Sequence, residues 1–286
     1  MDVKFFLVAL AFVGCATENT ENIDENQVPV EESNEEVNPP ETPETQPEPE
    51  SNACVPDESA QGMRLDGRIE YADGTIGDRT NTRIKMCCAG GCLVAEWGDE
   101  GFCYPEGRLE EGTYAFKAIP IGVEGLATPV SLINVGEEDI VLDNPVVIPE
   151  FSSEGDIVDG VFEAGNGLEI DVLASAFTPS YGSDDYIAAV DVDPMTIGLP
   201  LQEVTMDKVV GMWYLGSFGA TISPKWTFQV HDTGLPAGTQ VRILNSSYHD
   251  GKWLEAGTAT VGEDGVLYTD VDSGIGNLST LILVEE

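Results

Sequence analysis

Short alternations of apolar and polar residues, separated by turns rich in Gly, Asp and Asn, run from residue 54 to the C-terminus. Such a period of two predicts β-strands, because successive side chains of a strand point to opposite faces of a sheet. Tyr114, Phe116 and Ala118 give one example, and Asp73-Gly74 is typical of a hairpin turn. No long stretch has a helical period, so we predict an all-β protein.

The predicted strands fall into two groups. A polar, turn-rich segment at residues 150–159 follows the apolar residues 146–148 and separates the groups. Each group is long enough to bury a core of its own. We therefore predict two β-sandwich domains, over residues 54–150 and 155–286.

The first 14 residues differ from the rest of the chain. Residues 1–4 are weakly basic, and residues 5–12 form an apolar run. This run is too short to cross a hydrocarbon core of about 30 Å as a helix, and its position is typical of an export signal that is removed. We predict a signal peptide over residues 1–14.

The segment Phe12-Val13-Gly14-Cys15 resembles the lipobox of bacterial lipoproteins. The resemblance implies that the Cys15 thiol is diacylated and that Cys15 becomes the new N-terminus after cleavage. It also implies a lipid-anchored protein of the bacterial cell envelope, in contact with the membrane through that lipid only. Ala16 stands where some bacteria place a retention Asp, which favours the outer membrane. The alternative is an ordinary secretory signal with an incidental cysteine.

The segment that follows Cys15 is acidic and poor in apolar residues. Residues 16–52 contain twelve Asp and Glu and no Lys or Arg. Such a segment cannot bury enough apolar surface to offset the entropy of ordering, and its prolines favour extended conformations. We predict a disordered tether over residues 15–53, which holds the folded part about 50 Å or more from the lipid surface.

Residues 60–150 combine Gly-containing turns with alternating strand residues. The motifs are Gly67-Arg68-Ile69, Asp73-Gly74-Thr75, Ile84-x-Met86, Gly101-Phe102 and Leu109-x-x-Gly112-x-Tyr114-x-Phe116. Together they resemble the carboxypeptidase regulatory-like family. The resemblance implies a transthyretin-like β-sandwich of the kind found in many exported proteins.

The second half resembles two kinds of module. The run Trp213-Tyr214-Leu215-Gly216-Ser217-Phe218-Gly219-Ala220 before Pro224 is similar to a divergent ZU5-type module. The tail, with Leu235-Pro236-Ala237-Gly238-Thr239, Gly251-Lys252-Trp253 and Asp264-Gly265, resembles repeats of bacterial surface proteins. These resemblances imply an architectural or adhesive role without a catalytic set.

Charge restricts the partners of the chain. It carries 52 Asp and Glu against 12 Lys and Arg, a formal net charge of -40. We expect no nucleic acid partner, because phosphate binding needs clustered Lys and Arg. The surplus of acid fits a saline habitat, in which salt screens self-repulsion, or a solubility device, or a diffuse cation-binding surface.

The cysteines beyond Cys15 predict disulfides, because an exported protein meets an oxidising compartment. The segment from Cys87 to Cys103 indicates a hairpin closed by a disulfide, with either Cys87 or Cys88 bonded to Cys103. Cys88-x-x-x-Cys92 has a spacing seen in metal sites, but no His lies nearby, so we favour disulfides over zinc. The candidates are Cys54, Cys87, Cys88, Cys92 and Cys103.

No catalytic set is recognisable in the sequence. The two histidines are His231, on a predicted strand, and His249, in a predicted turn. Ser273 lacks the Gly two residues earlier that a nucleophile elbow requires. No pair of carboxylates has a spacing that fixes general acid and nucleophile roles. We therefore predict a non-enzymatic protein without a cofactor.

Calcium and glycans are the remaining ligand classes. Calcium prefers hard oxygen ligands, and alternation places Asp191 and Asp193 on one face; the alternative is a solvated acidic edge. Trp97, flanked by charged residues, could stack on a sugar ring, whereas the other three tryptophans fit core positions. The weak calcium candidates are Asp184, Asp185, Asp191 and Asp193.

The sequence thus predicts a lipid-anchored envelope protein with a structural, adhesive or display role. The alternative is a glycan- or calcium-dependent binding module at the cell surface. A protein ligand is also compatible with both.

Overall fold

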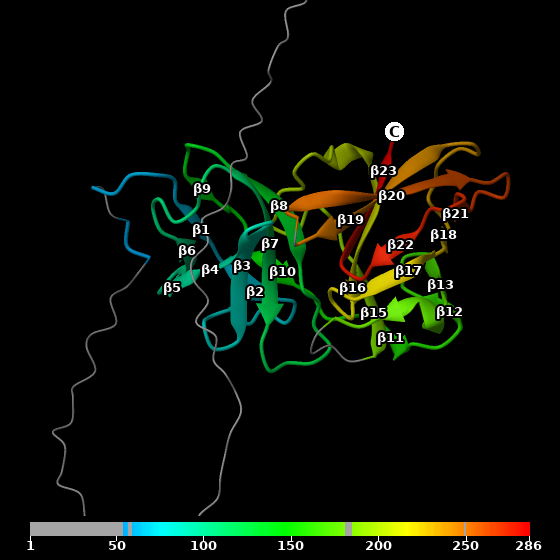
Figure 1. Ribbon diagram of the computed structural model, residues 1–286, viewed down its shortest axis with the longest axis horizontal. Coiled ribbons are helices and arrows are strands. Elements are labelled where there is room, and N and C mark those ends of the chain that lie inside the picture. Colours follow the sequence, from blue (N-terminus) through cyan, green and yellow to red (C-terminus); the bar gives the residue numbers. More distant parts are fainter. Residues whose placement is uncertain (1–53, 57–58, 181–184, 249) are drawn as a thin grey trace, which may run out of the picture.

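The computed structural model describes residues 54–56, 59–180, 185–248 and 250–286 (Figure 1). Within these residues the protein is all-β, as predicted: it has 23 strands, β1 to β23, and two short 3-10 helices, Ala174–Ala176 and Met206–Lys208. No helix of the described residues is long and apolar enough to cross a membrane. Cys15 and the predicted tether lie outside the described residues.

The N-terminal half has two layers of strands. One layer is a four-stranded sheet in the order β4-β3-β7-β8, and the other joins the sheet β5-β6-β1-β9 to the pair β10-β2. The strands of the first layer are β3 Thr82–Cys88, β4 Gly91–Val94, β7 Gly112–Pro120 and β8 Val130–Val135. Those of the second are β1 Leu65–Gly67, β2 Ile69–Tyr71, β5 Glu96–Gly98, β6 Gly101–Tyr104, β9 Ile140–Val141 and β10 Val146–Ile148.

Alternation along these strands fills the space between the two layers. Ile84 and Met86 of β3 are fully buried, as is Phe116 of β7, and they share one hydrophobic cluster with Leu65 of β1. The alternate residues of β3 and β7 point to the outer face of the first layer. The strand period predicted from the sequence is therefore the period that builds this core.

The C-terminal half is built on a ten-stranded sheet that curls until its two edge strands meet. A side chain at Gly155 of β11 would lie 3.6 Å from the Phe162 ring of β12. The order is β11-β15-β16-β23-β19-β20-β21-β18-β13-β12. Its strands are β11 Ser153–Asp156, β12 Gly160–Glu163, β13 Leu168–Val172, β15 Tyr186–Asp191, β16 Val209–Gly216, β18 Phe228–Val230, β19 Gln240–Ser247, β20 Lys252–Val261, β21 Leu267–Thr269 and β23 Thr280–Glu285. A smaller sheet consists of β14 Phe177–Thr178, β17 Thr221–Trp226 and β22 Ile275–Asn277.

Two strands of the large sheet are buried on both faces. In β16, Trp213 and Leu215 point into the curled sheet, whereas Met212 and Tyr214 belong to the cluster that also fills the N-terminal half. In β23, alternate residues divide in the same way between the two clusters. This explains why both strands read as continuous apolar runs rather than as alternations.

The two halves therefore share one hydrophobic cluster, across the boundary predicted at residues 150–155. Hydrogen bonds cross the same boundary: Thr280 Oγ1 donates to the Val130 carbonyl at 2.7 Å, and Val147 N–H donates to the Ile197 carbonyl at 3.2 Å. The Trp253 side chain packs against both the shared cluster and a smaller cluster on β3, β7 and β8. Continuous packing of this kind fixes one half against the other.

The disulfide pattern differs from the one predicted. Cys87 pairs with Cys92, because the β3-β4 register places these residues directly opposite each other, with Cα atoms 4.0 Å apart. Cys103 pairs with Cys54 and with neither Cys87 nor Cys88, because β6 lies in the other layer. No cysteine among the described residues is free.

Candidate functional site

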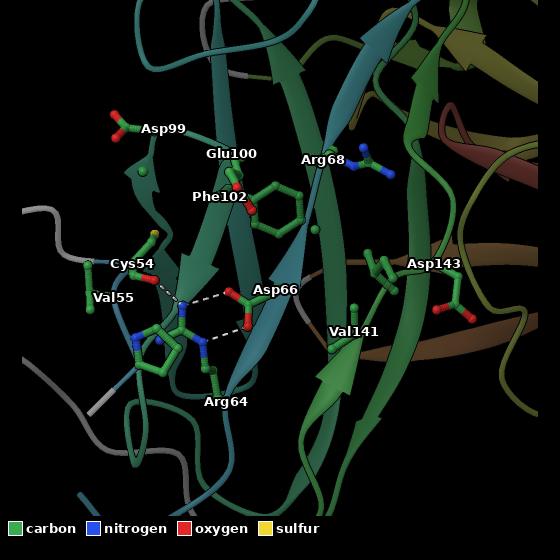
Figure 2. Close-up of a pocket in the computed structure, with 15 residues that line it drawn as sticks. Cys54, Val55, Arg64, Asp66, Arg68, Asp99, Glu100, Phe102, Val141 and Asp143 are labelled. Carbon is green, nitrogen blue, oxygen red and sulfur yellow. Dashed lines mark hydrogen bonds and ion pairs between the residues drawn. The ribbon is translucent and has the colours of Figure 1, made fainter. Parts of the chain in front are cut away.

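A groove of about 910 Å³ lies on the outer face of the β5-β6-β1-β9 sheet (Figure 2). Figure 2 shows Asp99, Cys54 and Val55 along one side, and Arg68, Val141 and Asp143 along the other. The groove therefore begins where the described chain begins, at Cys54.

Strand β1 forms the floor of the groove, and its alternation decides what the groove presents. Leu65 and Gly67 face the core, so Arg64, Asp66 and Arg68 face outward. Gly67 is required at its position, because a Cβ there would lie 2.6 Å from the Phe102 ring. Arg64 and Arg68, which flank the two ends of β1, are thus two of the few basic residues of the chain placed on one face.

Arg64 is buried and paired. Its side chain is 6% exposed, and its Nε and Nη2 donate to the two Asp66 carboxylate oxygens at 2.6 and 2.8 Å. Nη1 lies 3.5 Å from Glu106 Oε1. The hydrogen bond with Asp66, reinforced by the charge of Glu106, raises the pKa of Arg64 against the effect of burial. The guanidinium is therefore a permanent charge that Asp66 holds in place, while its buried Nη1 makes no hydrogen bond to the described residues.

Arg64 also holds the chain that enters the groove. Its Nη2 donates to the Cys54 carbonyl, as the dashed line in Figure 2 shows. Cys54 is bonded to Cys103 of β6, which lies opposite Asp66 in the β1-β6 register. Residue 54 is thus fixed to β6 by a covalent bond and to β1 by a charge-assisted hydrogen bond.

Arg68 is the counterpart of Arg64 that remains exposed. Its stem runs beside Gly101, where a Cβ would lie 3.0 Å from Arg68 Cγ and 2.2 Å from the Gly67 carbonyl oxygen. Gly101 also has a φ of 150°, so glycine is needed there for both reasons. Among the described residues the Arg68 guanidinium has no hydrogen bond or ion pair, so its five N–H groups face solvent.

The groove combines one available cation with several carboxylates and two apolar side chains. The carboxylates are those of Asp66, Asp99, Glu100 and Asp143. Val55 and Val141 are more than half exposed. Planar charged groups beside small apolar surfaces suit a ligand rich in hydroxyl groups, which can both donate and accept hydrogen bonds. No cluster of metal-binding side chains occurs among the described residues.

A second hollow, of about 490 Å³, lies between the β18-β19 connection and the β20-β21 turn. His231 lines it, and His231 Nε2 lies 3.3 Å from Glu169 Oε1. Asp264, also in the lining, accepts hydrogen bonds from Tyr268 Oη at 2.7 Å and from Val266 N–H at 3.1 Å, which lower the pKa of Asp264. The side chains of His231 and Asp264 are thus engaged by residues of neighbouring strands and turns.

The structure gives Ser273 a structural partner. Its hydroxyl oxygen accepts a hydrogen bond from Thr258 N–H at 3.0 Å, and the side chain is buried beside Gly257. His249 lies outside the described residues. Ser273 therefore contacts Thr258, whereas His231 contacts Glu169, and the two side chains have different partners.

The calcium candidates are spread along β15 rather than gathered. Asp185 precedes the strand and Asp191 ends it, so the two are about 20 Å apart by the rise of an extended chain. Asp193 lies beyond the strand, where its Oδ1 accepts from Met195 N–H at 2.9 Å in a turn. The strand ends at Asp191, and both Asp191 and Asp193 are exposed. Asp184 lies outside the described residues.

Trp97 is not the free aromatic face that its charged neighbours predicted. It is half-buried on β5, and its ring meets that of Phe102 edge-on at 6.0 Å between centroids. It packs against the shared core. Trp213 and Trp226 are buried, as predicted for core residues.

Sequence reasoning missed the groove. Its signal was available: Arg64, Asp66 and Arg68 occupy alternate positions in a chain with only 12 Lys and Arg. The sequence does not show that Cys54 and the turn at residues 98–101 lie beside the outer face of β1 and complete the groove.

Comparisons with protein-family models, with curated proteins and with solved structures found no match to this chain.

Proposed function

We propose that this chain is a non-enzymatic, lipid-anchored protein of the bacterial cell envelope, which displays a rigid β-structured body on an acidic tether. The observation that carries the proposal is the double attachment of Cys54, to Cys103 by a disulfide and to Arg64 by a hydrogen bond. It lies at the point where the predicted tether ends.

The double attachment suits a protein that is held by its N-terminal end. Tension on the tether passes into β6 through the disulfide and into β1 through Arg64, so it is shared between two neighbouring strands. Without these bonds the same tension would act on β1 alone, which pairs with β6 on one side and with β9 on the other. The shared core then transmits the tension to the C-terminal half without a flexible joint.

The arrangement of the body also fits display. Figure 1 places β1, β6 and β9 at one end of the long axis, and β12, β13 and β21 at the other. An anchor at the first end presents the far end of the ten-stranded sheet to the surroundings. The resemblance to carboxypeptidase regulatory-like and ZU5-type modules, which is a prediction from the sequence, agrees with such a role.

Fatty acid labelling tests the anchor. Cells that express the full chain are fed a radioactive fatty acid, beside cells that express Cys15→Ala. We expect label on the unaltered protein and none on the variant, and equal labelling of both would refute the proposal. Cys54→Ser is the matched control, because it changes the attachment of the body and should keep the label.

Protease treatment of intact cells tests display. We expect cleavage in residues 16–52, which would release a fragment that contains both halves. A protein that stays intact on whole cells, and is cut only after lysis, would contradict display at the surface and leave only the anchor.

Glycan binding in the groove is the second candidate function. It is favoured by the exposed Arg68 beside the carboxylates and the two exposed valines. A glycan array probed with the purified protein, with and without calcium, would detect it. We expect Arg68→Ala and Asp143→Ala to remove any signal, and Arg83→Ala, an exposed arginine on β3 in the other layer, to keep it. Signals that survive both groove variants would place the binding elsewhere.

A further inference from the structure

Lys117 lies where the two halves meet. It belongs to β7 and points to the outer face of the β4-β3-β7-β8 sheet, beside Val130 and Ala115 of the small cluster that the C-terminal half covers. The residue is 7% exposed. Lysines are almost never buried to this degree without a partner of opposite charge.

Two aromatic rings of the C-terminal half take the place of such a partner. The Lys117 ammonium lies 3.8 Å from the centroid of Tyr248 and 5.2 Å from that of Phe218. The two rings lie against each other, with centroids 5.3 Å apart. No hydrogen bond or carboxylate reaches Lys117 Nζ from the described residues. By contrast, Lys225 Nζ donates to the carbonyls of Ala256 and Asp272, at 2.7 and 3.2 Å.

A like charge lies directly across the sheet. Lys85 of β3 is opposite Lys117 in the β3-β7 register, and like charges in that position repel. Loss of hydration on burial, followed by the charge of Lys85, lowers the pKa of Lys117 to about 8. A neutral amine carries the lone pair that attacks a carbonyl carbon, so these surroundings favour the nucleophilic form.

We propose that Lys117 is a covalent modification site, whose ε-amine takes small aldehydes to form an imine. The neutral amine adds to the carbonyl carbon, a proton moves from nitrogen to oxygen, and loss of water leaves a carbon–nitrogen double bond. No oxidant or reductant is consumed. The protonated imine is a larger and less hydrated cation than an ammonium, which is the kind of cation that aromatic rings hold well.

The site is independent of the anchor and of the groove. Lys117 belongs to the other layer of the N-terminal half and faces the C-terminal half, whereas the groove lies on the outer face of the β1 layer. A protein without a lipid, or without a glycan ligand, would therefore still carry this site.

Reductive methylation of the folded protein at pH 7 provides the test. Limiting formaldehyde with cyanoborohydride traps each imine as a methylated lysine, and peptide mapping then gives the rate at every lysine. At pH 7 about a tenth of an amine with a pKa near 8 is neutral, against less than about a thousandth of an ordinary lysine. The neutral fractions alone favour Lys117 by more than about a hundredfold, and because burial slows the approach of formaldehyde we expect Lys117 to react about tenfold faster than Lys225. The lysines to be resolved beyond the predicted signal peptide are Lys85, Lys117, Lys208, Lys225 and Lys252.

Two controls separate reactivity from mere exposure. In denaturant, Lys117 and Lys225 should react at the same rate. The variant Lys85→Met removes the repulsive charge, so the rate at Lys117 should fall about threefold at pH 7, while the rate at Lys225 stays the same. A folded protein in which Lys117 reacts more slowly than Lys225, or in which Lys85→Met leaves the Lys117 rate unchanged, would overturn the proposal.

Discussion

Arg64 and Lys117 are two buried cations in one very acidic protein, and their surroundings are opposite. Arg64 meets two carboxylates and a backbone carbonyl, whereas Lys117 meets two aromatic rings and faces another lysine. The pKa of Arg64 is raised, and the pKa of Lys117 is lowered to about 8. Direct hydrogen bonds to a carboxylate favour the charged form of Arg64, even though its buried Nη1 makes no hydrogen bond to the described residues, whereas loss of hydration and a facing lysine disfavour the charged form of Lys117.

The difference also divides the molecule by role. The Arg64 region connects the folded body to the chain that precedes it, so its bonds must resist opening. The Lys117 region connects the two halves, where a shared core and hydrogen bonds such as that from Thr280 Oγ1 to the Val130 carbonyl hold them together. The partners of Arg64 are therefore expected to add stability at the first region, whereas the buried charge of Lys117 is expected to subtract from it at the second.

The largest expected effect comes from the disulfide of the Arg64 region. Replacement of Cys54 and Cys103 by serine opens a loop with a sequence separation of 49, against 5 for Cys87–Cys92. Loop-closure entropy predicts a loss of about 4 kcal/mol for the first pair and about 2 kcal/mol for the second. Urea unfolding of the two double variants measures both. Equal losses would remove the special role of the Cys54 attachment.

Arg64→Met should cost about 3 kcal/mol in the free energy of unfolding, because it removes the buried charge that the carboxylates of Asp66 and Glu106 contact. Arg68→Met on the same face is the matched control, and it should cost within about 0.5 kcal/mol, because its guanidinium is exposed. Urea unfolding at pH 7 compares them. A similar cost for both would show that the partners of Arg64 contribute nothing.

Lys117→Met should change the free energy of unfolding in the opposite direction and stabilise the protein by about 1 kcal/mol at pH 7. The Met side chain is of similar length to that of Lys but carries no charge to bury. The pKa of Lys117 is lower in the folded protein than in the unfolded chain. At a pH between these two pKa values the unfolded chain binds more protons than the folded protein, so the unaltered protein gains stability as pH rises. The advantage of the variant should therefore shrink from about pH 8 to about pH 10.5. Thermal unfolding over that range measures it, and a constant difference would contradict the lowered pKa.

Tyr214→Phe extends the comparison to a neutral group and has the smallest expected effect. The Tyr214 hydroxyl is buried in the shared core without a hydrogen-bond partner among the described residues. Its removal should be neutral or stabilise the protein by up to about 1 kcal/mol. Tyr71→Phe should cost about 1 kcal/mol instead, because the Tyr71 hydroxyl donates to the Asn81 carbonyl at 2.7 Å. Equal losses in urea unfolding would indicate that Tyr214 has a partner after all.

Local patterns in the sequence were sufficient for the fold class. Alternation along β3 and β7 predicted strands, and these strands carry the predicted side chains into the core. The same rule predicts that β16 and β23, with their unbroken apolar runs, are covered on both faces. It does not say what covers them, and in the structure one cover is the N-terminal half.

Features that depend on non-local pairing could not be predicted. The partner of Cys103 follows from the register of β1 on β6, which no short motif encodes. Lys117 occupies a regular strand position and differs from an exposed lysine only because Phe218 and Tyr248 cover it.

The anchor at Cys15 is the central claim, and mass spectrometry of the native protein tests it most directly. The proposal predicts that the N-terminal peptide of material isolated from membranes begins at Cys15 and carries the mass of attached acyl chains. A peptide that begins at Met1, or that contains an unmodified Cys15, would contradict it.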